Sequence, residues 1–142
     1  MTLHQLSVFM ENKPKKMASV LADLENFKVF ALSIAEAGEF GLIRLIVAEP
    51  EKAAKHLESC GHSIAKSKKN VEVTGVLITS EVKLSSIAEE LGNIGINIDY
   101  AYSTSSFISG SLALILRTDE QKKTEETLAK SGARILTNED LS

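Results

Sequence analysis

The chain has 142 residues, a formal net charge of −3 and one cysteine, Cys60. This charge gives nucleic acid no electrostatic attraction, one cysteine excludes an intrachain disulfide, and no apolar run approaches the roughly 20 residues that span a bilayer. We therefore expect a cytoplasmic protein without a signal sequence that binds neither nucleic acid nor membranes.

The first half of the chain alternates predicted strands and helices. Residues 3–10 read as a strand, and the turn 11–14 follows, with Asn12 as a helix cap and Pro14 in the first helical turn. The apolar spacing over 17–27 predicts an amphipathic helix. The next elements are a strand at 29–35, a hairpin framed by Gly38 and Gly41, a strand at 42–48, a helix from Pro50, and a short strand that begins at 63–65. Gly61 is placed to end the second helix in a left-handed cap.

The second half repeats this order. The predicted elements are a strand at 71–78, a helix at 84–94, strands at 96–103 and 111–117, a helix at 119–131 and a short strand at 133–137, after a linker at 66–70. This order indicates an α+β fold of two ferredoxin-like βαββαβ repeats, each an antiparallel sheet with helices on one face. The uncovered sheet face or edge of each copy is expected to meet the other copy.

The repeat is visible in the residues themselves. The apolar spacing of 17–27 recurs at 84–94, the apolar run at 42–47 recurs at 111–116, and the segment 60–64 recurs at 131–135. A unit of half this chain's length buries only about 60% of its unfolded surface, so it is marginal alone and has a physical reason to pack against its copy or a second chain. We predict domains at 1–68 and 69–142.

Two segments carry a resemblance to a known family. Residues 11–14 followed by an amphipathic helix resemble the strand, turn and helix of ACT domains, small regulatory modules that bind amino acids. Residues 95–99 followed by 103–105 resemble the second strand of a regulatory ACT domain of an aspartokinase. The likeness covers essentially the whole chain, with one ACT domain in each half. It implies sheets joined side by side, a homodimer, and a free amino acid bound in a cleft between ACT domains.

The resemblance also implies the binding residues. The positions in the first turn are Asn12, Lys13, Pro14, Lys15 and Met17, and those in the second turn are Glu81, Val82, Lys83 and Leu84. The strand and hairpin positions are Asn97, Ile98, Asp99, Ser103 and Thr104. Backbone N–H groups at a helix start suit a carboxylate, and the oxygens of Asn97 and Asp99 suit an ammonium group.

The two copies differ at these positions. Lys15 stands where the family has glycine after proline, and the second turn, 79–83, has neither proline nor glycine. Asn97 and Asp99 correspond to Phe30 and Leu32 in the first copy. We therefore predict an asymmetric site that uses the turn of the first copy and the strand of the second.

Structural interpretations of the same residues stay open. The turn at 12–14 can serve only as a helix cap, Asn97 and Asp99 are compatible with the exposed face of any half-buried strand, and 103–106 can be an ordinary polar hairpin loop. Lysines within 66–69 are typical of a solvated linker.

Metal binding and catalysis are not expected. His56, Cys60 and His62 form the one cluster of metal-compatible residue types, but structural zinc usually takes four ligands, so we expect core packing for Cys60 and surface positions for both histidines. We predict no metal and no cofactor. The chain lacks a nucleophile elbow, a phosphate-binding glycine loop and HExxH, so an enzyme is not expected.

The leading hypothesis is a stand-alone tandem ACT protein that binds a free amino acid and regulates an amino-acid metabolic enzyme. The alternative is a ligand-free ACT-type interaction module or the regulatory subunit of an amino-acid biosynthetic enzyme.

Overall fold

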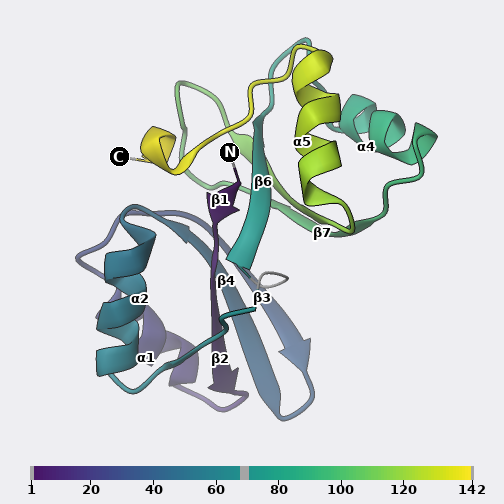
Figure 1. The fold of residues 1–142 in the computed structure, drawn as a ribbon. Helices are drawn as coiled ribbons and strands as arrows, with labels where there is room; N and C mark the ends of the chain where they lie inside the picture. The colour runs from purple at the N-terminus through teal and green to yellow at the C-terminus, as the bar shows by residue number, and fades with distance from the viewer. Residues whose placement is uncertain (1, 68–70, 142) are drawn as a thin grey trace.

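The computed structural model describes residues 2–67 and 71–141, which form two four-stranded antiparallel sheets, each with two helices (Figure 1). The predicted α+β class with two βαββαβ-type repeats is confirmed. Among the described residues, no helix is long and apolar enough to cross a membrane.

The first repeat follows the expected order. Its elements are β2 (Leu6–Glu11), α1 (Lys16–Asp23), β3 (Val29–Ala37), β4 (Phe40–Val47), α2 (Pro50–Ser59) and β5 (Ser63–Ile64), and the sheet order is β3-β4-β2-β5. Both helices cover one face of this sheet, because alternate strand residues point toward them. The buried residues of this core are Leu6, Val8, Val20, Leu24, Ile43, Leu45, Val47, Ala53 and Leu57. Gly61 follows α2 with φ of 90°, which confirms the predicted left-handed cap.

The second repeat has the same plan with a different sheet edge. Its elements are β6 (Glu72–Leu77), α4 (Leu84–Asn93), β7 (Ile98–Ser103), β8 (Ala113–Thr118), α5 (Gln121–Lys130) and a final 3₁₀ helix, η1 (Asn138–Leu141). The strand predicted at 133–137 is reduced to a single antiparallel bridge between Ile135 and Val76. The other part of this edge is taken by β1 (Leu3–His4), so the sheet order is β1-β6-β8-β7.

The N-terminal segment therefore belongs to both sheets. The single strand predicted at 3–10 is two strands, since Leu3 pairs with Val73 in β6 whereas Leu6 pairs with Leu45 in β4. Between them, the backbone N–H of Gln5 donates to the carbonyl of Val71 at 2.7 Å. The predicted boundary between residues 68 and 69 lies outside the described residues.

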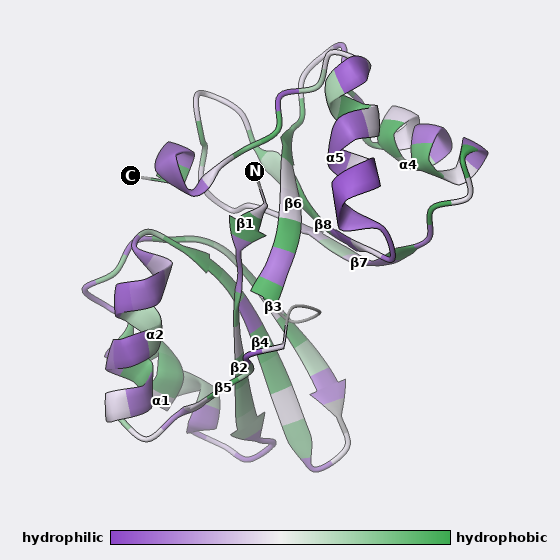
Figure 2. Ribbon diagram, in the orientation of Figure 1, coloured by the Kyte–Doolittle hydropathy of each residue, from purple (hydrophilic) through white to green (hydrophobic). Residues whose placement is uncertain are grey.

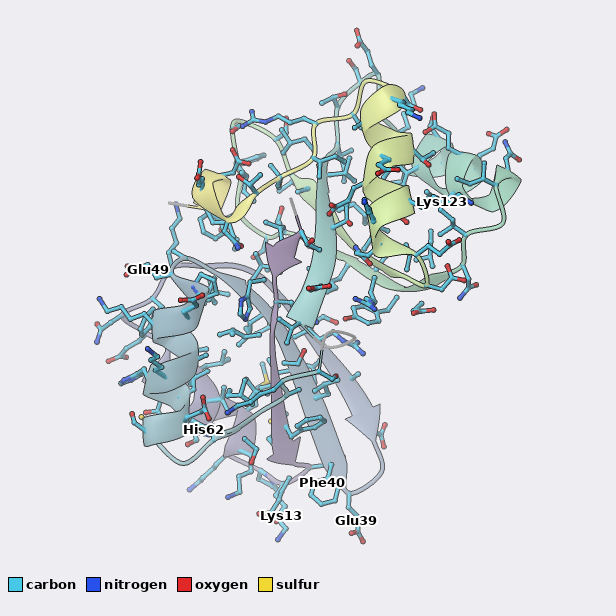
Figure 3. All side chains as sticks on the ribbon, viewed as in Figure 1. Lys13, Glu39, Phe40, Glu49, His62 and Lys123 are labelled. Atoms are coloured by element: carbon cyan, nitrogen blue, oxygen red, sulfur yellow. The ribbon has the colours of Figure 1, made fainter. Side chains whose placement is uncertain are left out.

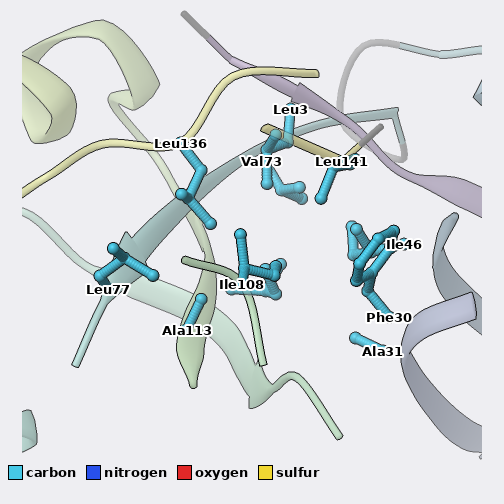
Figure 4. Close-up of a cluster of buried hydrophobic side chains, with 11 residues drawn as sticks. Leu3, Phe30, Ala31, Ile46, Val73, Leu77, Ile108, Ala113, Leu136 and Leu141 are labelled. Carbon is cyan, nitrogen blue, oxygen red and sulfur yellow. The ribbon is translucent and has the colours of Figure 1, made fainter. Parts of the chain in front are cut away.

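The repeats join through the sheet faces that their helices leave uncovered. A shared apolar core forms from both halves of the chain (Figure 4), and its buried members are Leu3, Phe30, Ala31, Ile46, Val73, Leu77, Ile108, Ala113, Ile115, Leu136 and Leu141. The expectation that the uncovered faces meet is confirmed. The expected side-by-side junction is wrong within one chain, because the hydrogen bonds of the described residues define two separate sheets. In Figure 2 the strands alternate between hydrophobic and more polar stretches, whereas α5 is largely hydrophilic.

Candidate functional site

The first turn is fastened to the neighbouring hairpin. The Asn12 backbone N–H donates to the carbonyl of Glu39 at 2.7 Å, and the Asn12 side-chain amide donates to the carbonyl of Gly38 at 3.2 Å. Asn12 is therefore not the helix cap that the sequence predicted, because its side chain is used to hold the β3–β4 hairpin. Pro14 lies before the helix and not in its first turn, since α1 begins at Lys16.

Lys15 precedes α1 in a left-handed backbone conformation. Its φ is 73°, and its side chain makes no capping hydrogen bond to the helix. A side chain in this region is strained by contact between its β-carbon and the backbone, and glycine avoids that strain. A left-handed backbone at this position suits the glycine that ACT domains place after proline, whereas this chain has Lys15 there.

Charged side chains surround the turn. Lys13 Nζ lies 2.9 Å from one carboxylate oxygen of Glu11, and Lys16 Nζ lies 4.0 Å from the other. The hydrogen bond from Lys13 and the two positive charges hold the pKa of Glu11 below its usual range. The carboxylate of Glu11 at the end of β2 thus lies close to the side chain of Lys16 at the start of α1.

A cleft of about 350 Å³ opens beside this turn. It is bounded by the end of β2, the first half of α1, the start of β4 and the segment that follows α2. Its lining residues are Phe9, Met10, Glu11, Lys16, Ser19, Val20, Phe40, Cys60, Gly61, His62 and Ser63. Figure 3 shows Lys13, Glu39 and Phe40 together at the end of the first repeat that lies away from the second repeat. We call this space the first-repeat cleft.

The same place in the second repeat is nearly closed. The space there is about 30 Å³, and its lining residues are Glu81, Val82, Ser86, Ile87, Glu90, Leu128, Ser131 and Ala133. One cause is strand length: β2 continues to Glu11 opposite Phe40, whereas β6 ends at Leu77 opposite Ala113. The other is Val82, whose side chain packs against the core of the second repeat. The open cleft is thus a property of the first repeat.

The second turn is organised by a hydroxyl. Thr79 Oγ1 accepts hydrogen bonds from the backbone N–H groups of Glu81 at 3.2 Å and Val82 at 3.1 Å. Lys83 precedes α4 with extended backbone, and Leu84 begins the helix with its side chain exposed. These bonds stabilise a compact turn around the small space.

The predicted strand residues lie at the start of β7. The Asn97 side-chain amide donates to Asp99 Oδ1 at 3.1 Å, and the Asn97 backbone N–H donates to Asp119 Oδ1 at 3.1 Å. Both Asn97 and Asp99 are exposed, whereas Ile98 packs against the core of the second repeat. Neither polar residue lines the first-repeat cleft. Their joint site with the first turn stays a prediction.

The family model described as an ACT domain pair matches residues 1–142. The chain belongs to this ACT domain pair family. A crystal structure of protein BT0572 from Bacteroides thetaiotaomicron is 31% identical, with 99% of this chain and 96% of that chain covered and a TM-score of 0.81. The ligand-free regulatory subunit of aspartate kinase from Thermus thermophilus is 12% identical, with 89% and 90% covered and a TM-score of 0.57, which is a likeness of fold. No curated protein sequence matches the chain.

In this ACT pair, the polar hairpin after β7 joins the two repeats. Thr104 is buried, and its hydroxyl accepts a hydrogen bond from the backbone N–H of Ala113 at 2.9 Å. The backbone N–H of Ser105 donates to the carbonyl of Phe30 in the first repeat at 2.8 Å. Ser103 is exposed. Thr104 therefore has a structural task in the hairpin, and its predicted ligand contact is untested.

The residues with metal-compatible side chains form two separate contacts. His56 Nε2 lies 3.8 Å from Cys60 Sγ, whereas His62 Nε2 lies 2.7 Å from Asp23 Oδ2. Cys60 is exposed, so its expected core packing is wrong, because it caps the end of α2 beyond the buried turn of Leu57. His62 is half-buried instead of on the surface, since it pairs with Asp23. In the ranges 2–67 and 71–141, no three histidine, cysteine, aspartate or glutamate side chains form a metal-compatible group.

A polar network that was not predicted from the sequence lies between the repeats of this ACT pair. Gln5 is fully buried, its amide nitrogen donates to Tyr100 Oη at 2.9 Å, and its amide oxygen accepts from Tyr102 Oη at 2.5 Å. The Arg44 guanidinium lies 3.7 Å from the centroid of the Tyr100 ring. Burial raises the pKa of Tyr102 far above its usual value. The alternation of Tyr100 and Tyr102 along one strand was the available signal that both face the other repeat.

Proposed function

We propose that this ACT pair is a regulatory protein that binds a free amino acid in the first-repeat cleft. The observation that carries the proposal is the position of the cleft: it borders the turn that resembles the ACT motif, and its counterpart in the second repeat has less than a tenth of its volume. Ligand binding would favour one arrangement of the protein by no more than its differential affinity for the two arrangements.

The charges at the cleft suit the main-chain end of an amino acid. Lys16 and Glu11 both line it, and their side-chain charges are 4.0 Å apart at the closest pair of atoms. A zwitterion carries a carboxylate and an ammonium group at a similar separation, so each can approach the opposite charge. The Ser19 and Ser63 hydroxyls add hydrogen-bonding groups to the same lining. This match supports an amino acid over a singly charged ligand.

The strand prediction requires a second chain. Asn97 and Asp99 are exposed and do not line the cleft of their own chain. A ligand contact that combines them with the first turn would therefore be made by another copy, and the proposal includes a homodimer. Size-exclusion chromatography with light scattering tests the homodimer separately. If the protein is a monomer at ligand-binding concentrations, Asn97 and Asp99 do not belong to the site.

The experiment is a thermal melt of the full chain against each of the twenty amino acids. A ligand at 100 times its Kd contributes about 2.7 kcal/mol of stability, which is a clear shift for a protein of this size. A response to one or a few amino acids supports the proposal. A flat panel would contradict it and favour the alternative of a ligand-free interaction module, for which the exposed Phe9 and Phe40 side chains would be the contact surface.

The same thermal melt tests whether Asn97 and Asp99 contribute to ligand binding. Asn97→Ala and Asp99→Ala each remove a polar group from an exposed position, so the fold should tolerate both changes. Loss of the ligand-induced shift in these variants supports a two-chain site. An unchanged shift in both would confine the site to the first repeat.

A further inference from the structure

We propose that the first-repeat cleft selects amino acids with a large apolar or aromatic side chain. This inference rests on the proposed function, that the cleft binds a free amino acid, and adds the chemical class of that ligand. It follows from the aromatic walls of the cleft, from the pairing of its charged groups and from its size.

Two aromatic residues are among those that line the cleft. Phe9 is 45% exposed and Phe40 is 55% exposed, and both line the cleft. Val20, which is buried, and Met10, which is half-buried, extend the apolar lining toward the core. Covering this surface with a hydrocarbon side chain removes apolar area from water on both partners, which is favourable. A ligand with a small or polar side chain would leave the Phe9 and Phe40 rings exposed to water.

The second repeat shows that the fold does not need these aromatic residues. The pairing of Leu6 with Leu45 in β2 and β4 corresponds to that of Val76 with Leu114 in β6 and β8. Counted along the chain from these pairs, Phe9 corresponds to Thr79, and Phe40 corresponds to Ser109. The second repeat folds with small polar residues at both places, and there the cleft is closed. The repeat with the open cleft is thus the one that has the two phenylalanines.

The cleft offers no counter-ion for a charged side chain of the ligand, because the charged groups that line it already have partners. Glu11 is paired with Lys13 and Lys16, and His62 is paired with Asp23 at 2.7 Å. The Glu11–Lys16 contact is long, so both side chains can turn toward a zwitterion. Once they bind its ammonium and carboxylate groups, no further counter-ion is left among the lining residues. A charged ligand side chain would lose water without gaining a partner, which is costly. Lysine, arginine, aspartate and glutamate are therefore disfavoured.

The size of the cleft also favours a large ligand. Its volume of about 350 Å³ lies in the range of small-molecule sites. A large amino acid such as phenylalanine or tyrosine fits in this open space and covers more of its lining than a small one does. Glycine, alanine and serine would leave much of it to water. Size and polarity select the same class.

The test is a calorimetric titration of the full chain with phenylalanine, leucine, serine, aspartate and lysine. Phe9→Ala and Phe40→Ala remove the aromatic walls one at a time. Phe107→Ala is the matched control, because Phe107 is 71% exposed and lies in the second repeat outside the cleft. We expect phenylalanine or leucine to bind at least tenfold more tightly than serine, aspartate or lysine. We expect each cleft variant to weaken that binding at least fivefold, and Phe107→Ala to leave it within twofold.

The outcomes separate this inference from the proposed function. Tighter binding of serine, aspartate or lysine would overturn the apolar class and leave amino-acid binding in place. Binding of phenylalanine or leucine that survives both cleft variants would also overturn the inference, because the aromatic walls would then play no part. No binding of any amino acid in the full panel of melts would overturn both.

Discussion

The Leu3 side chain occupies the space that a β-carbon on Gly75 would require, with Leu3 Cδ1 at 2.5 Å from that position. Leu3 belongs to β1, the short N-terminal strand that lies along the edge of β6, and its side chain is fully buried in the core shared by both repeats. Leu136 closes the same space, with its Cδ1 at 3.2 Å. Glycine at position 75 thus lets a residue from the start of the chain dock onto the second sheet.

Gly75→Ala should therefore destabilise the protein. The added methyl group forces Leu3 or Leu136 out of a packed core, and overpacking of this kind costs about 1–3 kcal/mol. Gly92→Ala is the matched control, because a β-carbon there meets nothing within 4 Å and Gly92 lies in α4, where alanine is the better helix former. Urea unfolding of the three proteins checks the prediction. Equal stability of Gly75→Ala and the wild type would show that β1 does not pack as described.

Lys15→Gly should stabilise the protein. The φ of 73° at Lys15 is a conformation that costs a non-glycine residue about 1–2 kcal/mol, part of which is lost again through the greater freedom of glycine in the unfolded chain. Lys83→Gly is the control, since Lys83 also precedes a helix but has extended backbone with φ of −92°. Thermal melts should show a larger gain at position 15 than at position 83. Equal gains would mean that helix capping, and not relief of strain, explains the effect.

Glu125 should make stability depend on pH in an unusual direction. Its side chain is 8% exposed, Thr74 Oγ1 donates to its carboxylate at 3.0 Å, and burial raises its pKa in the folded state despite that hydrogen bond. A carboxyl group with a raised folded pKa favours folding when protonated. Its contribution is therefore present below the unfolded pKa of about 4.3 and is lost as pH rises through the folded pKa.

Glu125→Gln should accordingly raise the Tm at pH 7, with a gain that shrinks as pH falls toward 4. Glutamine keeps an oxygen that can accept from Thr74 but carries no charge. Glu126→Gln, at the exposed neighbouring position, should show no such pattern. A gain that is constant across this pH range would contradict burial of an ionised carboxylate as the cause.

Tyr102 should resist ionisation while the protein is folded. Burial is the main reason that its pKa is raised, the neighbouring Tyr100 adds to the effect, and Arg44 opposes it. The neutral phenol is thus the form that the folded state favours, and stability should fall as pH rises above about 10, where an unfolded tyrosine ionises.

The chain has two tyrosines and no tryptophan, so Tyr100→Phe leaves Tyr102 as the one source of tyrosinate absorbance. During an alkaline titration of this variant, the tyrosinate absorbance should appear at the same pH as unfolding. Circular dichroism measures the unfolding. Tyrosinate that forms near pH 10 in a folded protein would contradict the desolvation of the Tyr102 hydroxyl between the repeats.

Local patterns predicted the repeat units well, because each depends on short-range periodicity. The apolar spacing around Val20 and Leu24 indicated α1, and the same spacing around Ile87 and Leu91 indicated α4. The uncovered faces were also expected to meet. Non-local pairing was not predictable in this way: the alternation of residues 3–10 indicates a strand but not that Leu3 pairs with Val73 while Leu6 pairs with Leu45.

The candidate site stays a prediction. The motif at 11–14 indicated a turn, which lies beside the first-repeat cleft, and the unequal polar residues of the two copies led to the prediction of an asymmetric site. The cleft itself depends on the length of β2 and on the segment 60–63 approaching α1, and neither has a local signature. Asn12 shows the limit most clearly, since its residue type favours a helix cap but a hairpin distant in sequence takes its side chain.

The central claim is that a ligand occupies the first-repeat cleft and not its counterpart. Ser19 lines the first-repeat cleft on α1, and Ser86 lines the small space of the second repeat at the corresponding place on α4. Ser19→Trp fills the first and Ser86→Trp the second. The decisive measurement is the calorimetric titration of the wild type and both variants with the amino acid that gives the largest thermal shift. We predict that Ser19→Trp abolishes binding and that Ser86→Trp binds as the wild type does. Binding that persists in Ser19→Trp, or that is lost only in Ser86→Trp, would contradict this account.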